Sequence, residues 1–528
     1  MSLAELTNIP GQVESIIRQC NYIADPLSAY QHICANNSNT MLLESAEIDS
    51  KNHLQSLILV DAALKLTCSG DTVSARALND NGKPLLAFLA QKLADVQCLR
   101  SNENEITFVF ARAKSLLDED ARLKSVSVFD VLRCLQQEID ALNDHPHAVF
   151  VGGTFAYDLL ATYETLPEVP EGDNDCPDYV FYLAQCLVLI DHKAQTSEII
   201  GSVFSGKDVA HNYFAVSQQV ETLCADVKQL EPTTVVKEEI GEQAPPVSVN
   251  KSDAEYCEEV VQLKERILAG DIFQVVPSRC FSLPCPNPHE AYKQLKLHNP
   301  SPYMFYINDD DFIIFGASPE SALKYQHDSN QVEVYPIAGT RPRGKRGNGD
   351  IDPDLDSRIE LTLREDNKEK AEHLMLVDLA RNDIARVAKP GTRHVKDLLK
   401  VDRYSHVMHL VSRVVGQLRE DLDCLHAYQA CMNMGTLVGA PKVRAAQLIR
   451  EVEQTRRGSY GGAVGYINGK GDMDTCIVIR SAFIKNHTAF VQAGAGVVYD
   501  SVPQAEADET RGKAQAVIHA IQAAHNAK

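Results

Sequence analysis

Three charged residues near the C-terminus have the spacing of an active-site face. Glu506, Glu509 and Lys513 stand at i, i+3 and i+7, so a helix would place them on one side. The preceding segment 492–498, QAGAGVV, alternates like a strand, and its two glycines would let a ligand approach the backbone. Free N–H groups there would bind a carboxylate while a glutamate held a metal ion. The alternative is a bend followed by a surface helix with a salt bridge between Glu509 and Lys513.

A second acidic face is predicted in the segment 364–388, which reads as one long helix. Glu365, Glu369 and Glu372 stand there at i, i+4 and i+7. Alone they would form a solvated face, with Lys368 paired to Glu372. Because the C-terminal glutamates form another cluster, two carboxylates from distant helices would suit Mg²⁺. The usual cysteine and histidine spacing of a zinc site is missing.

Three further positions have side chains or backbone suited to binding anions or moving protons. His409 lies in 407–418, which alternates like a strand, and a histidine in a strand is more often structural than catalytic. The segment 435–442, GTLVGAPK, precedes an amphipathic helix, where anions commonly bind. Arg480 lies in the predicted strand 474–484, and an arginine within a strand needs an anionic partner.

Composition limits the class of protein. The chain has 528 residues, 44% of them hydrophobic, and can therefore bury a large core. Its net charge of −21 argues against nucleic acid and against an anionic membrane surface as partners. It has no apolar run of membrane-spanning length, no signal-peptide pattern and 14 scattered cysteines without a CxxC motif. These features predict a cytoplasmic protein with reduced thiols.

The helices and strands that must position these residues are expected to form an α+β fold with an antiparallel sheet. Residues 1–226 are expected to form an N-terminal domain, and residues 251–528 a second domain. The segment 227–250 is polar, contains prolines and lacks an apolar period, so we interpret it as a linker.

Local patterns also predict where helices begin. We expect a helix over 10–20. Ser252 and Glu255 fit a capping box that opens an amphipathic helix. Ser501 and Gln504 fit a second capping box, which would open the helix with the C-terminal glutamates.

Nine motifs in order resemble the chorismate-utilising enzymes, specifically anthranilate synthase component I. They are ASPES (317–321), PIAGTRPRG (336–344), EHLMLVDLARNDIARV (372–387), HLVSRVVG (409–416), GTLVGAPKVRA (435–445), SYGGAVGY (459–466), IVIRSA (477–482), QAGAGVVYDS (492–501) and EADET (506–510). The similarity runs from about residue 42 to the C-terminus. It implies an α+β fold of two interlocked domains, whose largely antiparallel sheets form a sandwich around a chorismate site.

The resemblance also implies roles for individual residues. Glu372 and Glu509 would be the ligands of Mg²⁺. The implied substrate contacts are Gly339, Thr340, Tyr460, Arg480, Gly494, Ala495 and Gly496. His409, Glu320, Thr436 and Lys513 resemble further active-site residues of the family.

The implied reaction adds ammonia to ring carbon C2 of chorismate as the C4 hydroxyl leaves, with Glu320 as the candidate acid. The aminodeoxyisochorismate so formed loses pyruvate and becomes anthranilate, and His409 would assist this elimination. Relatives that add water have a lysine at the position of Gln274, which a neutral glutamine cannot replace as a base. Aminodeoxychorismate synthases commonly have PIKGT, whereas this chain has Ala338 in PIAGT. Both differences imply anthranilate as the product.

Two other segments, LLESAEIDSK (42–51) and NPSPYMFY (299–306), resemble the tryptophan-binding elements of the family. The implied contacts are Ser45, Pro302, Tyr303 and Met304, with Glu44 and Lys51. Their alternative role is packing within hairpins. Feedback inhibition by L-tryptophan would require coupling between this pocket and the chorismate site. The chain itself contains no tryptophan, which suits an enzyme that is needed when tryptophan is scarce.

The chain shows no glutaminase motif, so ammonia from glutamine would come from a separate glutamine amidotransferase subunit, component II. We therefore expect a heteromeric complex, a dimer of such pairs. Two alternatives are aminodeoxychorismate synthase component I and a non-catalytic tryptophan sensor. Ala338 together with the LLES motif argues against the first, and the presence of Glu372 and Glu509 argues against the second.

Overall fold

The computed structural model describes residues 6–35, 37–45, 54–112, 117–230, 244–347, 349–404 and 407–525. In the first half the strands are β1 Gln12–Cys20, β2 Thr40–Glu44, β3 Gln55–Ser69, β4 Thr72–Ala77, β5 Gln97–Ser101, β6 Glu105–Val109, β7 Asp140–Ala141, β8 Phe150–Phe155, β9 Tyr179–Asp191 and β10 Thr196–Phe204. The helices are α1 Pro26–Cys34, α2 Lys83–Lys92, α3 Glu119–Leu123, α4 Asp130–Gln137 and α5 Val209–Lys228, with a 3-10 turn at Tyr157–Thr162.

The second half begins with short elements around the helix α6. Its strands are β11 Ser248–Val249, β12 Gln274–Val275, β13 Ser278–Pro284, β14 Tyr303–Asn308, β15 Ile313–Ser318, β16 Ser321–Gln326, β17 Gln331–Val334, β18 Ile337–Pro342, β19 His394–Arg403, β20 Val407–Gln417, β21 Gly439–Ala440, β22 Ala463–Asn468, β23 Met473–Ile477, β24 Ser481–Lys485 and β25 Thr488–Gly494. Its helices are α6 Asp253–Leu268, α7 Pro288–His298, α8 Pro353–Glu365, α9 Asn367–Ala385, α10 Cys424–Cys431, α11 Gly435–Val438, α12 Lys442–Glu453 and α13 Pro503–Ala524.

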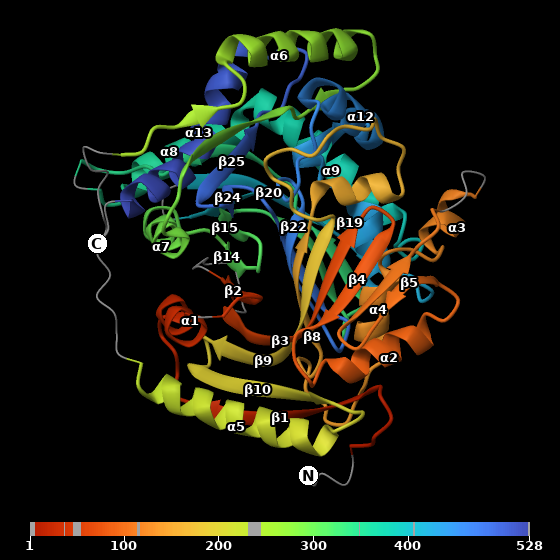
Figure 1. The fold of residues 1–528 in the computed structure, drawn as a ribbon. Coiled ribbons are helices and arrows are strands. Elements are labelled where there is room, and N and C mark those ends of the chain that lie inside the picture. Colours follow the sequence, from red (N-terminus) through yellow and green to blue (C-terminus); the bar gives the residue numbers. More distant parts are fainter. Residues whose placement is uncertain are drawn as a thin grey trace.

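The first half is organised around two long antiparallel strands, β3 and β9. Register shifts between Leu59 and Leu64 interrupt their ladder, and such bulges increase the local twist of a sheet. The sheet continues from β9 through β10 to β1. Helix α5 lies along the outer face of β1 and β10 at the bottom of Figure 1.

The two halves share hydrogen-bonded strands rather than meeting only at side chains. Strand β2 pairs with β3 on one side and with β14 on the other. Strand β8 likewise pairs with both β9 and β22. The core is also shared, because the ring of Phe155 stacks on that of Tyr428 at 4.2 Å between centroids. The predicted α+β fold with largely antiparallel, interlocked sheets is confirmed, while the domain boundaries at 226 and 251 stay a prediction.

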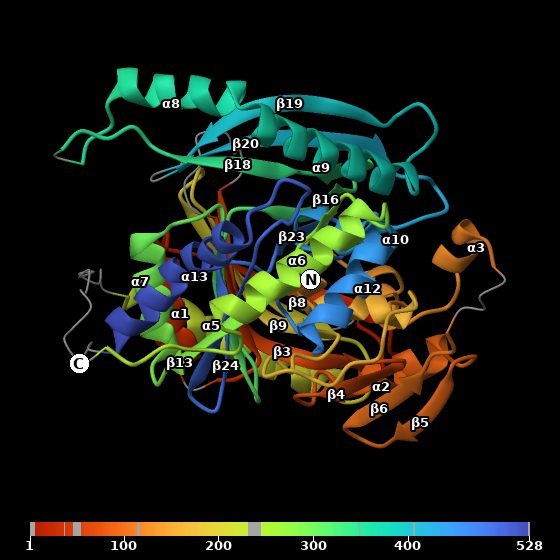
Figure 2. The ribbon, with the colours of Figure 1, turned by 90° about the horizontal axis from the view of Figure 1, so that it is seen from above.

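Helices cover the strands that carry the candidate site. Figure 2 shows α8 and α9 crossing the antiparallel layer of β18, β20 and β19. Helix α13 packs against α6 and α7 on another side. The predicted capping box of α6 is confirmed, since the Ser252 side chain accepts the Glu255 N–H and the Glu255 carboxylate accepts the Ser252 N–H.

Three local predictions are wrong. Residues 12–20 form strand β1 instead of a helix, because their backbone pairs with β10. The predicted helix 364–388 is two helices, and Asp366 caps the second one by accepting the N–H groups of Lys368 and Glu369. Ser501 does not cap α13, because the N-cap residue of this helix is Val502. The Ser501 hydroxyl instead accepts the Val498 N–H at 3.0 Å.

Candidate active site and a second cavity

The predicted catalytic, substrate and metal residues converge on one cavity of about 440 Å³. All of them line it except Ala495, which is fully buried beside it. The lining residues include Glu320, Gly339, Thr340, Glu372, His409, Thr436, Tyr460, Arg480, Gly494, Gly496, Glu506, Glu509 and Lys513. Residues that lie far apart in the sequence are thus brought together by the sheet and the helices that cover it.

Glu320 is the buried acid of this cavity. It lies in the tight connection between β15 and β16, and its Oε1 accepts a hydrogen bond from the Thr436 hydroxyl at 2.9 Å. Burial raises the pKa of the Glu320 carboxyl to about 8, against the opposing effects of the Thr436 hydrogen bond, Lys513 and Arg480. The carboxyl is therefore largely protonated at neutral pH and can donate a proton.

His409 and Thr340 face each other across β18 and β20. They form a register pair, and the Thr340 hydroxyl lies 2.8 Å from His409 Nδ1. Burial, with a smaller contribution from Arg480, lowers the pKa of His409 to about 4, so the ring is neutral at physiological pH. The neighbouring Gly339 has a φ of 87°, which favours glycine, and a Cβ there would lie 3.1 Å from a carboxylate oxygen of Glu369.

Carboxylates from two helices meet at the other wall. Glu372 projects from α9, and Glu506 and Glu509 project from α13. Burial raises the pKa of Glu372, Lys368 opposes this shift, and the negative charges of nearby glutamates, Glu509 and Glu506 among them, reinforce it. Lys513 Nζ lies 2.6 Å from Glu509 Oε1 and donates to the Gly494 carbonyl at 3.0 Å.

These carboxylates fit the predicted Mg²⁺. Oxygen ligands are those that Mg²⁺ prefers, and it commonly binds one or two carboxylates and completes its shell with water and substrate oxygens. The negative charges of Glu372 and Glu509 repel each other, and a cation bound between them would relieve this repulsion. Within the described residues no group of three or more His, Cys, Asp or Glu side chains is close enough to hold a metal by itself.

The prediction that Arg480 lies within a strand is wrong. The chain leaves the pairing of β23 with β16 and β22 and enters that of β24 with β15 and β25. Arg480 lies at this switch, with a φ of 49°, and lines the cavity. Its carbonyl accepts the Ala317 N–H at 3.1 Å. A left-handed residue between two strands suits the exchange of partners and leaves the guanidinium free to meet a substrate anion.

The glycine segment that ends β25 is only partly available to a ligand. Gly494 and Gly496 line the cavity. The Ala495 N–H, however, donates to the Pro277 carbonyl at 3.2 Å, so the predicted row of free N–H groups is wrong at this residue. A Cβ at Gly496 would lie 2.9 Å from the side-chain nitrogen of Gln274, so any larger residue would press on that amide.

A second cavity, of about 380 Å³, lies where the two halves join. Of the predicted tryptophan contacts, Glu44, Ser45, Tyr303 and Met304 line it. Pro302 is buried but does not line it, and Lys51 lies outside the described residues. The Glu44 carboxylate accepts hydrogen bonds from Tyr292 at 2.7 Å and Lys296 at 2.5 Å.

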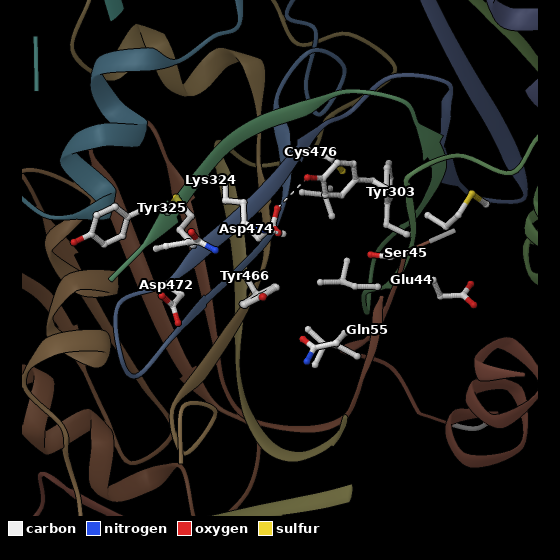
Figure 3. Close-up of a pocket in the computed structure, with 18 of the residues that line it drawn as sticks. Glu44, Ser45, Gln55, Tyr303, Lys324, Tyr325, Tyr466, Asp472, Asp474 and Cys476 are labelled. Atoms are coloured by element: carbon white, nitrogen blue, oxygen red, sulfur yellow. Dashed lines mark hydrogen bonds and ion pairs between the residues drawn. The ribbon is translucent and has the colours of Figure 1, made fainter. Parts of the chain in front are cut away.

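The sequence did not predict the opposite wall of the second cavity. It is formed by side chains from β16, β22, β23 and the adjoining turn, among them Lys324, Tyr466, Asp474 and Cys476. Figure 3 shows Tyr303 directed toward Asp474, which accepts its hydroxyl at 3.2 Å, and Lys324 Nζ lies 3.2 Å from the same carboxylate. Lys324, Asp474 and Cys476 lie outside the motifs, and their place in the wall depends on the pairing of β16 with β23. Tyr466 ends the motif 459–466, but nothing in that motif indicates that it faces a second cavity.

No helix among the described residues is long and apolar enough to cross a membrane.

The family model described as chorismate binding enzyme matches residues 94–519. The chain is 57% identical over 516 residues to anthranilate synthase component 1 of Vibrio cholerae serotype O1, covering 98% of each chain. It is 54% identical over 517 residues to the protein of the same name from Escherichia coli K12, covering 96% of each.

A solved structure gives the same similarity at the level of the fold. The crystal structure of anthranilate synthase component I from Streptococcus pneumoniae TIGR4 superposes with a TM-score of 0.69 at 27% identity. The match covers 90% of this chain and 94% of that chain. The relatives therefore span both halves and both cavities.

Proposed function

The chain belongs to the anthranilate synthase component 1 family of chorismate-binding enzymes, and we propose on this premise how its residues convert chorismate and ammonia to anthranilate and pyruvate. This is the first step of tryptophan biosynthesis. The observation that carries the mechanism is the buried Glu320, whose pKa is raised to about 8 by burial, in a cavity that also contains Arg480 and two facing carboxylates. A proton donor, an anion-binding group and a candidate metal site are thus present together.

In the first stage the nitrogen of ammonia forms a bond to C2 of the substrate ring, both ring double bonds shift, and the bond from C4 to its hydroxyl breaks. Glu320 donates the proton with which the hydroxyl leaves as water. Thr436 holds the orientation of this carboxyl through the 2.9 Å hydrogen bond. Arg480 and the backbone at Gly494 and Gly496 would orient the substrate carboxylates.

In the second stage the aminodeoxyisochorismate loses its enolpyruvyl group as pyruvate, C2 gives up its proton and the ring becomes aromatic. We assign His409 to assist this elimination, because its neutral imidazole can accept a proton. Thr340 orients the ring through its contact with Nδ1. Tyr460 and Gly339 complete the substrate walls, and Lys513 fixes the position of Glu509.

Glu372 and Glu509 would hold Mg²⁺ together with a carboxylate of the substrate. When bound, the ion would supply positive charge that orients this carboxylate and stabilises its negative charge. The chain's own contribution is to present the two glutamates from α9 and α13 on one side of the cavity.

The choice of ammonia rather than water rests on the neutral side chain of Gln274, and the choice of anthranilate rather than aminodeoxychorismate rests on Ala338. Gln274 and Ala338 line the cavity where related enzymes carry lysines, as the sequence comparison implied. Neither residue can deprotonate water or form a covalent bond to the ring. Ammonia needs no such base, since its lone pair is available for attack.

We further propose that L-tryptophan binds in the second cavity and inhibits the reaction. The cavity offers aromatic walls for an indole and carboxylates for an amino group. Two strands would transmit the effect. Strand β16 begins directly after Glu320 and carries Lys324, and the Ile477 N–H at the end of β23 donates to the Glu320 carbonyl at 3.0 Å. Displacing either strand would alter the position of the acid, which gives inhibition a physical route.

Ammonia would reach the enzyme from a glutamine amidotransferase subunit, component II, in a heteromeric complex formed as a dimer of such pairs. The relatives are named anthranilate synthase component 1, and this name supports the existence of a second component. We also propose a cytoplasmic location, for which the reduced state of the 14 free cysteines is support.

Anthranilate fluorescence tests the proposal. The purified chain is mixed with chorismate, Mg²⁺ and excess ammonium, and in a parallel reaction glutamine replaces ammonium. We expect anthranilate with ammonium only, and with glutamine after a component II subunit is added. Aminodeoxychorismate as the product, or intact chorismate, would contradict the proposed function.

A further inference from the structure

A fully buried ion pair lies directly behind the substrate cavity. Arg457 is 2% exposed and Glu453, at the end of α12, is 7% exposed. Two N–H groups of the guanidinium donate to the Glu453 carboxylate, at 2.8 and 2.5 Å. Neither residue lines the cavity itself.

The remaining contacts of Arg457 reach three separate walls of the cavity. Its Nη1 donates to the Leu437 carbonyl at 2.9 Å, and its Nη2 donates to the Val276 carbonyl at 2.6 Å. Its guanidinium lies 5.6 Å from the ring centroid of Tyr460. Leu437, Val276 and Tyr460 all line the cavity.

Glu453 extends the same network to a fourth wall. Its Oε1 accepts both the N–H and the hydroxyl of Ser278, each at 2.7 Å. The Ser278 hydroxyl in turn accepts a hydrogen bond from the side chain of Gln492 at 2.8 Å, and Gln492 lines the cavity. Ser278 is also the register partner of Gly494, one of the candidate substrate contacts.

We propose that Glu453 and Arg457 are positioning residues, which fix the distances between four cavity walls and so set the affinity for chorismate. The inference rests on the proposed function. The planar guanidinium directs its N–H groups at fixed angles, so one side chain can hold the carboxylate and two backbone carbonyls at once. A lysine at position 457 would keep the positive charge but not these angles. A neutral residue in place of Glu453 would leave the charge of the buried Arg457 without an opposite charge beside it.

The test compares variants of this pair with those of a matched pair elsewhere. Lys65 and Asp309 also form a buried ion pair, with 2.6 Å between Nζ and Oδ2, and neither lines either cavity. Glu453→Gln and Asp309→Asn each convert a buried carboxylate to an amide. Arg457→Lys keeps the charge of the proposed pair. Each variant is measured for thermal unfolding and, in its folded fraction, for kcat and for KM with chorismate and with ammonium.

We expect Arg457→Lys and Glu453→Gln to raise KM for chorismate by about tenfold or more, the size of one lost charge-assisted hydrogen bond. Asp309→Asn is expected to lower the unfolding temperature and to leave KM for chorismate unchanged. A folded Arg457→Lys variant with the KM of the parent chain would overturn the inference.

Ser278→Ala is the milder variant, since it removes only the link from Glu453 to Gln492. If the ion-pair variants do not fold, this one decides: a severalfold rise in KM for chorismate supports the inference, and an unchanged KM overturns it. Failure of the proposed function gives a different result, because the parent chain would then produce no anthranilate from ammonium.

Discussion

The two cavities differ in which parts of the chain build them. Every side chain that lines the substrate cavity comes from residues 274–513, in the second half of the chain. The second cavity combines five residues of β2, β3 and their ends with strands β14, β16, β22 and β23 of the second half; the five are Leu43, Glu44, Ser45, Gln55 and Leu57. The proposed chemistry is thus contained within one half, whereas the second cavity depends on the pairing of β2 with β14.

This difference suggests why the second cavity suits regulation. A ligand there touches both halves, so it can respond to and alter their relative placement. The candidate substrate cavity is lined instead by one half, and burial raises the pKa of its Glu320 and lowers that of its His409. If the comparison is right, variants in one cavity should leave ligand binding in the other intact.

The largest expected effect is that of Glu320→Gln. The amide cannot donate a proton as a carboxylic acid does, so we expect kcat to fall by about 10²- to 10⁴-fold, the usual contribution of general acid catalysis. Tryptophan should still raise the unfolding temperature, because the second cavity is unchanged. Steady-state anthranilate fluorescence and thermal unfolding measure the two effects. A kcat within tenfold of the parent value would exclude Glu320 as the essential acid.

The next largest effect is expected for Glu372→Gln. Loss of one proposed ligand should raise the Mg²⁺ concentration for half-maximal activity by at least about 10- to 100-fold, the effect of losing only an outer-shell partner of a metal ligand. Titration of activity with Mg²⁺ after chelation measures this change. Lys368→Met is the control, since it removes an ammonium group 3.9 Å from the Glu372 carboxylate. This variant is expected not to weaken the binding of Mg²⁺. Equal Mg²⁺ dependence in Glu372→Gln and the parent chain would refute the assignment.

The pH dependence should show the raised pKa of Glu320. The protonated form is the active one, so kcat/KM for chorismate is expected to fall above about pH 8, by tenfold per pH unit, at a constant concentration of free ammonia. This basic limb should be absent from the residual activity of Glu320→Gln. A limb that persists in the variant would belong to another group.

The same pKa predicts the direction of a stability effect. The folded chain binds more protons at Glu320 than the unfolded chain between the ordinary value of 4.5 and about 8. The free energy of unfolding contributed by this group therefore falls as the pH rises through this window. Urea unfolding at the two ends of the window, with Glu320→Gln as the reference, measures it. A contribution that rises with pH would contradict the assigned pKa.

The substrate cavity was predictable from sequence because its residues sit in compact motifs whose side-chain types reveal their chemistry. Helical spacing correctly placed Glu506 and Glu509 on α13, and alternation correctly gave the strand that carries His409. Arg480 was placed wrongly in a strand, since nothing in IVIRSA indicates that the chain changes partners there. The break at Asp366 was missed although its spacing to Glu369 fits a helix start.

Long-range pairing explains the remaining errors. Residues 12–20 mix apolar and polar residues without a clear period, and their pairing with β10, more than 170 positions later, makes them a strand. The wall of Lys324, Tyr466 and Asp474 in the second cavity depends in the same way on β23 pairing with both β16 and β22. Sequence motifs reveal residues that do chemistry, but not neighbours created by the sheet.

The smallest expected effect on catalysis, and the sharpest test of the comparison, comes from Ser45→Leu. Ser45 lines the second cavity beside Tyr303, and a leucine there would occupy space and remove a hydroxyl. We expect the tryptophan concentration for half-maximal inhibition to rise by about tenfold, equivalent to about 1.4 kcal/mol of binding free energy, while kcat and KM for chorismate stay within twofold. Anthranilate production at graded tryptophan concentrations measures both. If kcat falls with the inhibition, the two cavities are not separable, and the first half contributes to the chemistry as well as to its control.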